Sequence, residues 1–560
     1  MNTISSFFKI SWAVLFAFLV VSCETFLAED PKGKLAPENY FSSRSDLDRA
    51  THALNQNVNY ICSSEERVQA YAAGDDIGVA KNRTGNNQSI YDTYDKVQGN
   101  HGDMAEQWVY LFRVVKAANF IICNAGRTPV DQSVIDCYLA NAYYWRAFAY
   151  FQLVTIWGPV PMLTTEGVDY AAPLASIEDI WTKLIFPDME MAEKAPIRWS
   201  NVPNAANEAS LGGNAWVTQQ AAKATTAYLY LAYAGWPTNH TDYYAKAATK
   251  AKEVIDGVDN GTYPNGLMDE FWQNYSYQYK TNCKETLLTR YHRTNSGNWN
   301  AYDVLPGDVI GFNADGSVNT ARGWTEFLAE IKFWKEFPEG PRKEQTYAQK
   351  TLINDDDDGV ILVDWWDERR AENVRTPWFC KIIQFRSDNV AAYSDWGGEW
   401  HYSKGTTAVT GHSEKPCNVV RLSEVYCWYA EAVARSGQGD KAKAVEVLNK
   451  VRNRADQAQT NLYTTSMSNE ALADAAVKEH GWEIAGDFYT ILAPRSFDMF
   501  RLYLFEAHYN YRKANPGIEV APGVIRKEAK EVPASVTWDP KNIYSAYPDA
   551  DALINPNLIH

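Results

Sequence analysis

The segment from Asp136 to Trp157 places aromatic and aliphatic residues on almost every side of a helix. A helix that is apolar all round belongs in the interior of a protein. Gly158-Pro159-Val160-Pro161 ends it, because glycine adopts the cap conformation and proline cannot continue a helix. The chain therefore has to build its fold around one long, deeply buried helix.

This helix belongs to the first of three predicted helix pairs. The pairs lie near residues 104–157, 218–256 and 420–454. In the second helix of the two later pairs, small or apolar residues recur with a spacing of four and then three. These residues are Ala247, Ala251 and Val254, and Ala444, Leu448 and Val451. Such spacing is typical of tetratricopeptide-like helices, which pack closely. The predicted fold class is mainly α, a tetratricopeptide-like helical repeat scaffold.

Three long stretches interrupt the helical pattern. Residues 71–103, 257–320 and 355–418 are poor in helix periodicity and rich in Gly, Asn, Asp, Tyr and Trp. Irregular segments of this length usually carry function in a compact protein. We therefore expect long irregular loop excursions that form a binding surface on the scaffold. A GxGxxA string from Gly437 to Ala442 follows a predicted helix and not a strand, which argues against a nucleotide site.

The N-terminus has the pattern of an export signal. Lys9 precedes an apolar run that ends at Ser22-Cys23, in a form that resembles a bacterial lipobox. Acyl chains linked to the Cys23 thiol would anchor the protein, since each buried methylene contributes roughly 0.8 kcal/mol. The alternative is an ordinary secretory signal with an accidental cysteine. We predict a lipoprotein signal peptide at 1–22, lipidation at Cys23, an acidic tether at 23–37 and a single binding domain at 38–560.

The formal net charge of the chain is −16 at pH 7. Nucleic acid and anionic lipid are poor partners for such a chain, because phosphate binding needs a basic surface. No stretch after the leader approaches eighteen uncharged apolar residues, so we expect membrane contact through the lipid anchor only. The later cysteines form no CxxC pair. Cys123, Cys137 and Cys427 fall within helical patterns, where we expect small core residues.

Several strings along the chain resemble one known family. They are Cys23-Glu-Thr-Phe-Leu-Ala-Glu-Asp-Pro31, Ala142-Tyr-Tyr-Trp-Arg-Ala-Phe-Ala-Tyr-Phe-Gln-Leu-Val-Thr-Ile-Trp-Gly-Pro-Val-Pro161, Arg421-Leu-Ser-Glu-Val-Tyr-Cys-Trp-Tyr-Ala-Glu-Ala432 and Asn555-Pro556-Asn557-Leu558. In these strings the chain resembles the SusD/RagB family of outer-membrane nutrient-binding lipoproteins. The segment 482–501 departs from the family's late motif, and residues 290–415 resemble nothing that we can place.

The resemblance implies a function. Members of this family are lipid-anchored in the outer membrane, exposed at the cell surface, and hold oligosaccharides or polysaccharide in an aromatic cradle. They deliver the glycan to a SusC-like TonB-dependent transporter and usually have no catalysis of their own. Some relatives take peptides instead. The resemblance therefore implies a non-enzymatic glycan-binding protein of polysaccharide utilisation, with a peptide-capturing protein as the alternative.

A sugar ring offers an apolar face to aromatic side chains and a rim of hydroxyls to polar ones. Candidate ligand-binding aromatics lie in polar or glycine-rich strings, and each could instead be packed onto the scaffold. The best candidates are Trp299, Tyr302, Trp396, Trp400, Tyr91 and Tyr94, with the carboxylate of Asp76 beside the last two in sequence, and Trp365 comes next. Other tryptophans fall on helical faces and are expected in the core, namely Trp108, Trp145, Trp157, Trp181 and Trp428.

Signatures of catalysis are weak. The nine histidines form no HExxH motif, and the string that begins at Gly411 has Lys415 where a nucleophile elbow needs glycine. A surface glycoside hydrolase is kept as an alternative, because a pair of carboxylates leaves no motif. A scaffold that binds only proteins is another.

A single stretch suggests a metal. Asn354-Asp-Asp-Asp-Asp-Gly359 resembles the first half of a calcium loop, with Asp356 and Asp358 at the third and fifth positions. Trp365 stands where the loop needs a bidentate glutamate, so a solvated acidic turn is the alternative. We expect no other cofactor.

Overall fold

The structure is a computed structural model of the chain. It describes residues 40–63, 74–80, 92–167, 169–198, 215–276, 279, 283–290, 311–312, 318–319, 327–381, 417–487, 492–529 and 531–558. The predicted signal peptide, Cys23 and the acidic tether lie outside these residues and stay predictions.

The first group of helices surrounds the predicted buried helix. It consists of α2 (Arg44–Ser63), α5 (Gly102–Asn124), η1 (Ala125–Arg127), α6 (Gln132–Trp157), α7 (Ile177–Ile180), η2 (Trp181–Ile185) and α8 (Phe186–Ala192). α6 packs against α5 and α8, and α5 packs against α2. The rings of Tyr144, Trp145 and Phe148 in α6 are fully covered. Arg146 of α6 forms two hydrogen bonds of 2.7 Å to Asp188 of α8, so its buried charge is paired.

The second group contains the two later helix pairs. Its members are α10 (Gln219–Ala234), α11 (Tyr243–Asp259), α15 (Leu422–Ser436), α16 (Lys441–Asp456) and α17 (Asn469–Ile484). α15 packs against α11, α16 and α17. Gly437 ends α15 with a φ of 65°, and the Asp440 side chain accepts a hydrogen bond from the Lys443 N–H to cap α16. The turn between these helices is therefore built as its sequence predicts.

The described strands form antiparallel ladders of two strands each. The pairs are β1 (Gly78–Ala80) with β7 (Phe327–Ala329), β2 (Val160–Pro161) with β3 (Leu174–Ala175), β4 (Thr286–Arg290) with β12 (Cys417–Arg421), β5 (Gly311–Phe312) with β6 (Val318–Asn319), β8 (Tyr347–Ala348) with β11 (Trp378–Phe379), β9 (Lys350–Asp355) with β10 (Gly359–Asp364), and β13 (Ile518–Ala521) with β14 (Val524–Arg526). β12 is a correction to the sequence prediction, which started a helix at Val420.

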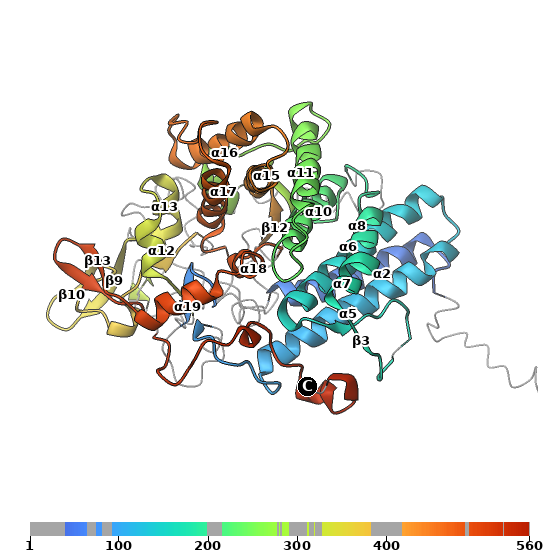
Figure 1. Ribbon diagram of the computed structural model, residues 1–560, viewed down its shortest axis with the longest axis horizontal. Helices are drawn as coiled ribbons and strands as arrows, with labels where there is room; N and C mark the ends of the chain where they lie inside the picture. Colours follow the sequence, from blue (N-terminus) through green and yellow to red (C-terminus); the bar gives the residue numbers. More distant parts are fainter. Residues whose placement is uncertain are drawn as a thin grey trace, which may run out of the picture.

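Shorter helices complete the described chain. They are α12 (Ile331–Glu336), α13 (Pro341–Thr346), α18 (Arg495–Arg501), α19 (Phe505–Ala514) and α20 (Asp549–Ala552), with single turns at η3 (Phe271–Tyr275), η5 (Glu372–Val374), η7 (Pro540–Ile543) and η8 (Pro556–Leu558). Figure 1 shows the long helices on the right and at the top, and a lobe with α12, α13, β9 and β10 on the left.

The prediction of a mainly α fold on a tetratricopeptide-like scaffold is confirmed. The largest buried cluster runs through α2, α5, α6, α10, α11 and α15. The tryptophans predicted in the core are confirmed there, since Trp108, Trp145, Trp157, Trp181 and Trp428 are at most 4% exposed.

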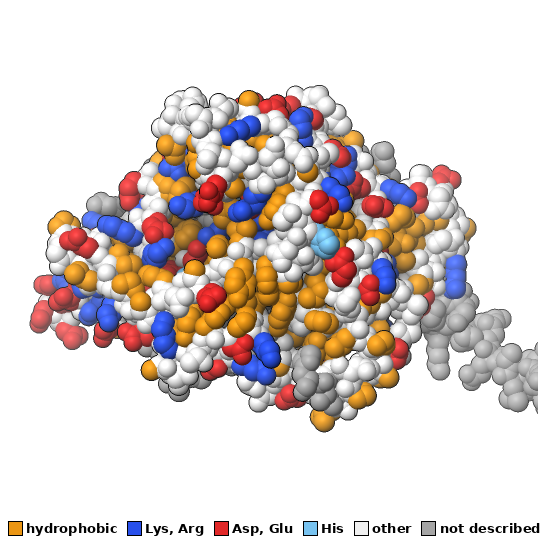
Figure 2. All heavy atoms as spheres, in the orientation of Figure 1, with side chains coloured by type: hydrophobic (Ala, Val, Ile, Leu, Met, Phe, Trp, Pro, Cys, Tyr) orange, Lys and Arg blue, Asp and Glu red, His pale blue; other side chains and the backbone are white. Residues whose placement is uncertain are grey.

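Hydrophobic side chains also gather across the middle of the face drawn in Figure 2, in the region of α18 and α19. A smaller buried cluster lies in these helices and contains Phe500 and Phe505, with half-buried Trp236, Trp538 and Tyr544 packed against it. Amphipathic aromatic side chains of this kind can bury their rings and keep a polar edge in water.

Two of the helical cysteines are not core residues. Cys123 is exposed and Cys137 is half-buried, whereas Cys427 is buried as predicted. Cys123 lies near the end of α5, two residues after the buried Ile121, so it points away from the face that packs on α6. The helical pattern predicted the helix correctly and the side of the helix incorrectly.

One helical segment of the described chain, Gly102–Arg127, is long and apolar enough to cross a membrane by length and composition. It is α5 with η1, and it packs between α2 and α6. One face of it is buried there, including Leu111, Val114 and Ala118, whereas Val109 on another face is 38% exposed.

Candidate functional site

Two loop excursions are attached side by side. Strand β4 ends at Arg290, strand β12 begins at Cys417, and these two residues are partners in one antiparallel ladder. The stretches attached there carry the main predicted ligand-binding aromatics, which are Trp299, Tyr302, Trp396 and Trp400. These four residues lie outside the part of the chain that the structure describes. Their points of attachment nevertheless lie next to each other.

The other ends of the same stretches also meet. Ala80 pairs with Phe327, and the Phe327 ring lies 6.1 Å from the Phe379 ring, with 21° between their planes. The chain continues from Ala80 toward Tyr91, reaches Phe327 after Trp299, and leaves Phe379 toward Trp396. Phe327, Phe379 and Cys417 belong to one continuous buried cluster. We name Ala80, Arg290, Phe327, Phe379 and Cys417 the strand junction.

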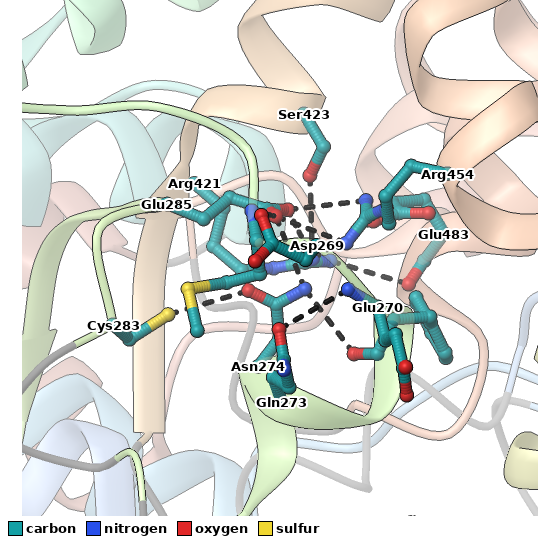
Figure 3. Close-up of polar contacts among 12 residues, drawn as sticks. Asp269, Glu270, Gln273, Asn274, Cys283, Glu285, Arg421, Ser423, Arg454 and Glu483 are labelled. Atoms are coloured by element: carbon teal, nitrogen blue, oxygen red, sulfur yellow. Dashed lines mark hydrogen bonds and ion pairs between the residues drawn. The ribbon is translucent and has the colours of Figure 1, made fainter.

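A buried charge cluster lies at the other end of the β4–β12 ladder, as Figure 3 shows. Arg421 Nη1 lies 3.2 Å from Glu285 Oε1 and 3.0 Å from Glu483 Oε1. Arg454 Nη1 lies 2.9 Å from Glu285 Oε2, and Arg454 also contacts Glu483. Arg342 extends the cluster, with Nη1 2.9 Å from Glu483 Oε2 and Nη2 2.6 Å from Glu479 Oε1. The cluster ties β12, α13, α16 and α17 to the residue before β4.

Burial makes this cluster a structural element and not a ligand site. The side chains of Glu285, Arg421 and Glu483 have no exposed surface. Burial alone would raise the pKa of Glu483, but Arg454, Arg421 and Arg342 outweigh it and lower that pKa. No sequence motif marks the cluster, since Arg421 and Glu285 are 136 residues apart. Its role is to hold the ladder from which the excursions start.

Lys381 connects the two regions. It is the last described residue before the stretch with Trp396, and it is 2% exposed. Its Nζ lies 3.2 Å from the Tyr275 hydroxyl and 3.3 Å from the carbonyl oxygen of Glu483. Burial lowers the pKa of Lys381 to about 7. The excursion is thus attached through a buried amine whose charge changes near neutral pH.

Asp76 is held in a salt bridge. Both of its carboxylate oxygens face Arg495, at 2.7 Å from Nε and 2.8 Å from Nη2. Burial would raise the pKa of Asp76, but Arg495 lowers it. The Asp76 side chain keeps 28% of its surface exposed. Its contact with a ligand stays a prediction.

Tyr94 does not present its ring to solvent, which corrects the sequence prediction. It has a φ of 57° and is 7% exposed. Its hydroxyl donates to the Gly74 carbonyl oxygen at 2.7 Å and lies 2.6 Å from His508 Nδ1. The ring packs edge-on against Phe505 and Trp538. At 7% exposure the Tyr94 ring offers too little surface to stack on a sugar.

Trp365 is also a correction. It is fully buried, and its ring makes T-shaped contacts with Trp334 at 5.0 Å and with Trp366 at 5.1 Å. Trp365 belongs to a buried cluster that contains Trp334 and Tyr347, and half-buried Trp366 packs against it. In this chain, the Trp365-Trp366 pair therefore packs in the interior and does not form a ligand platform.

The acidic loop is the turn of that hairpin. Asp355 Oδ1 accepts the N–H groups of Asp357 at 3.0 Å and Asp358 at 3.1 Å, and Gly359 takes a φ of 74°. Among the described residues, no three His, Cys, Asp or Glu side chains are arranged to hold a metal ion. Calcium binding by Asp356 and Asp358 stays an untested prediction.

His480 carries a role that sequence reasoning missed. Its Nδ1 lies 2.6 Å from Asp498 Oδ2 and its Nε2 lies 3.3 Å from Glu424 Oε2. Burial opposes protonation, but the two carboxylates raise the pKa of His480 to about 9. A buried, charged histidine therefore joins α17 to α15 and α18.

The stability provided by His480 should depend on pH. Because the pKa is raised on folding, the contribution is complete below about pH 6.5 and disappears as pH rises through 9. We expect His480→Gln to cost roughly 2–3 kcal/mol of unfolding free energy at pH 6 and much less at pH 9.5. Urea denaturation at both pH values measures the difference. His240→Gln, at a half-exposed site, is the control, and a loss independent of pH would contradict the assignment.

Two family models match different parts of the chain. The model described as starch-binding associating with outer membrane matches residues 25–231, and the model of the SusD family matches residues 392–559. SusD-like protein P2 of Formosa agariphila is 23% identical over 541 residues, which cover 92% of this chain and 97% of that protein.

Solved structures share the fold over nearly the whole length. A SusD homolog from Bacteroides thetaiotaomicron superimposes with a TM-score of 0.70 at 17% identity, covering 93% of this chain and 97% of that one. A structure solved with a xylogluco-oligosaccharide has a TM-score of 0.63 at 18% identity, covering 91% of this chain and 97% of the other. At this identity the likeness establishes the fold.

Proposed function

The chain belongs to the SusD/RagB family, and from that premise we propose that it is a lipid-anchored surface protein that captures a glycan and delivers it to a TonB-dependent transporter. Its family is one of glycan-binding proteins associated with the outer membrane. Lipid anchoring, surface exposure and delivery to a transporter are the parts that belong to the proposal.

The observation that carries the proposal is the strand junction. Three excursions, which are widely separated in sequence, are attached to residues that pair or stack on one another. Their aromatic residues therefore start from one region of the body. Several rings from one region can act together on a sugar chain, whereas a single loop aromatic cannot.

The family supports a glycan as the class of ligand and does not identify which glycan is bound. The description of one matching family model names starch binding, and one solved structure of the same fold contains a xylogluco-oligosaccharide. These are different glucans associated with one fold, so we expect the excursions to determine which glycan is bound. Three or four aromatic contacts predict an affinity in the micromolar to millimolar range.

The proposal is tested by affinity electrophoresis of the mature chain in gels that contain amylopectin, xyloglucan or a β-1,3-glucan, with serum albumin as a reference. We expect retardation in at least one glycan gel and no new reducing ends after incubation. Binding of peptides without retardation by any glycan would favour a peptide-capturing protein. Release of sugars would identify a hydrolase.

Cys23→Ala should release the protein from the membrane. Without acyl chains nothing replaces the free energy of the buried methylenes, so we expect nearly all of the protein in the soluble fraction. Fractionation and immunoblotting measure the shift, and protease added to intact cells measures exposure at the surface. Cys123→Ala is the matched control, because Cys123 is exposed and lies in the folded body. Equal membrane retention of both variants would contradict the anchor.

A further inference from the structure

A cavity lies between α5, residues 161–170 and the C-terminal segment. It encloses about 230 Å³, and Trp108, Phe112 and Leu163 line its apolar part. The Asp549 N–H donates to the Gly99 carbonyl oxygen at 3.0 Å, which holds the C-terminal segment near the start of α5. Figure 1 shows the C-terminus beside the first turns of α5. We call this space the C-terminal cavity. None of the residues of the strand junction lines it.

Hydrogen bonds hold the walls of the C-terminal cavity in place. Asn119 Nδ2 donates to the carbonyl oxygens of Leu163 and Thr165, both at 3.0 Å, and Arg146 donates to Asn119 Oδ1 at 2.7 Å. Asn555 Nδ2 donates to the Ala172 carbonyl oxygen at 2.9 Å. The amides of both asparagines are therefore used by the fold. A cavity with fixed walls binds without the cost of ordering them.

Other polar groups of the rim keep hydrogen-bonding capacity. The Trp108 indole donates to the Asp551 carboxylate, which leaves the remaining lone pairs of that carboxylate available. Glu166 and Asp169 add two carboxylates, and Lys116 adds one exposed ammonium. The rim also carries apolar surface that is open to water, since Tyr170 is 65% exposed and Ile554 is 60% exposed. Tyr170 and Ile554 therefore offer accessible apolar surface at the rim of the cavity.

We propose that the C-terminal cavity is a second carbohydrate subsite, which binds one neutral sugar unit through Phe112 and Tyr170 and accepts hydrogen bonds from its hydroxyls at Asp551, Glu166 and Asp169. The proposal rests on the proposed function for the class of ligand. The cavity is smaller than the pockets that enclose a drug-sized ligand, so it suits one unit or a chain end. It gives the protein a second contact with a polysaccharide, and two weak sites on one chain raise its retention.

The charges of the rim predict selectivity. The rim carries three carboxylates and one ammonium group. Sugar hydroxyls can donate hydrogen bonds to these carboxylates, whereas a carboxylated or sulfated sugar is repelled by them. A neutral sugar should therefore bind more tightly than its uronic acid counterpart.

Saturation-transfer NMR on the mature chain tests the subsite. The protein carries Trp299→Ala, Trp396→Ala and Trp400→Ala, so that the predicted excursion site is disabled, and the probes are methyl β-D-glucopyranoside and methyl β-D-glucuronide. We expect saturable millimolar binding of the glucoside, weakened about fivefold by Tyr170→Ala, and clearly weaker binding of the glucuronide. Asp551→Asn should reduce the difference in affinity between the glucoside and the glucuronide. Ile525→Ala, which removes a 62% exposed side chain elsewhere, should change neither.

Absence of saturable glucoside binding would overturn the proposal, and so would unchanged binding after Tyr170→Ala or equal binding of the two probes. These outcomes are separate from the proposed function. The glycan gel uses the protein that keeps Trp299, Trp396 and Trp400, so its retardation depends on the excursions. The NMR signal of the glucoside is measured on the triple variant, so it depends on the C-terminal cavity.

Discussion

Glu483→Gln should lower the free energy of unfolding by about 3–5 kcal/mol. The Glu483 carboxylate lies 3.0 Å from Arg421 and 2.9 Å from Arg342, and it also contacts Arg454. Glutamine keeps the size of the side chain but removes the charge. Three buried guanidiniums would then lose one shared carboxylate and keep Glu285, Glu424 and Glu479, and an uncompensated buried charge is costly because water cannot reach it.

Urea denaturation at pH 7 measures this loss, and Glu446→Gln is the matched control. Glu446 lies on α16 near the same helices, but its side chain is 49% exposed and its pairs with Lys443 and Lys450 are at the surface. Exposed pairs contribute at most about 1 kcal/mol. Equal losses in the two variants would mean that the buried charge cluster does not stabilise the fold.

Acid should remove the same contribution. The pKa of Glu483 is lowered on folding, so its stabilisation is present above the ordinary glutamate value and is lost as pH falls below it. The difference between the wild-type protein and Glu483→Gln should therefore shrink below about pH 4. The His480 contribution has the opposite dependence, since that pKa is raised and the loss occurs at alkaline pH.

The helical scaffold could be predicted because its signals are local. The hydrophobic periodicity predicted α6. Asp440 predicted the start of α16, and its side chain accepts a hydrogen bond from the N–H three residues later. Periodicity could not predict β12, the strand before α15. Residues 417–421 form a strand only because β4 lies beside them, and β4 is more than a hundred residues earlier in the chain. Pairing between distant segments leaves no pattern in either segment alone.

The buried ion pairs, in the charge cluster and outside it, could not be predicted for a related reason. Glu424, Glu431 and Glu483 are spaced like solvated residues on helices, yet each is at most 2% exposed. Their partners come from other elements, as when Arg501 of α18 donates two hydrogen bonds of 2.7 Å to Glu431 of α15. A charged residue is expected at the surface unless a partner neutralises it, and the partner is known only once the fold is known.

The errors at Tyr94 and Trp365 have one physical cause. Both residues lie near acidic residues in segments without helix periodicity, which favoured exposure, and both rings pack on other elements of the fold. Tyr94 reaches His508 across 414 residues, and Trp365 packs on Trp334 of α12. Local polarity describes the backbone of a loop, whereas burial of a large ring depends on what the loop covers.

Trp299→Ala, Trp396→Ala and Trp400→Ala together should weaken binding of a recognised glycan by about a hundredfold. Each ring that stacks on a sugar contributes about 0.5–1.5 kcal/mol beyond its burial. If at least two of the three rings contact the ligand, the combined loss reaches roughly 2–3 kcal/mol with burial included. The three residues lie outside the described structure, but the excursions that carry them are attached at Arg290 and Cys417, which are paired.

Affinity electrophoresis with the best-retained polysaccharide measures the loss, and circular dichroism checks that the variant is folded. Leu462→Ala, which removes a 56% exposed apolar side chain elsewhere, is the control for a general change of surface. Single variants sort the three rings, because a ring that only packs on the scaffold should lower the melting temperature and leave affinity unchanged. If the folded triple variant kept full affinity, the ligand would have to be held by side chains other than these three.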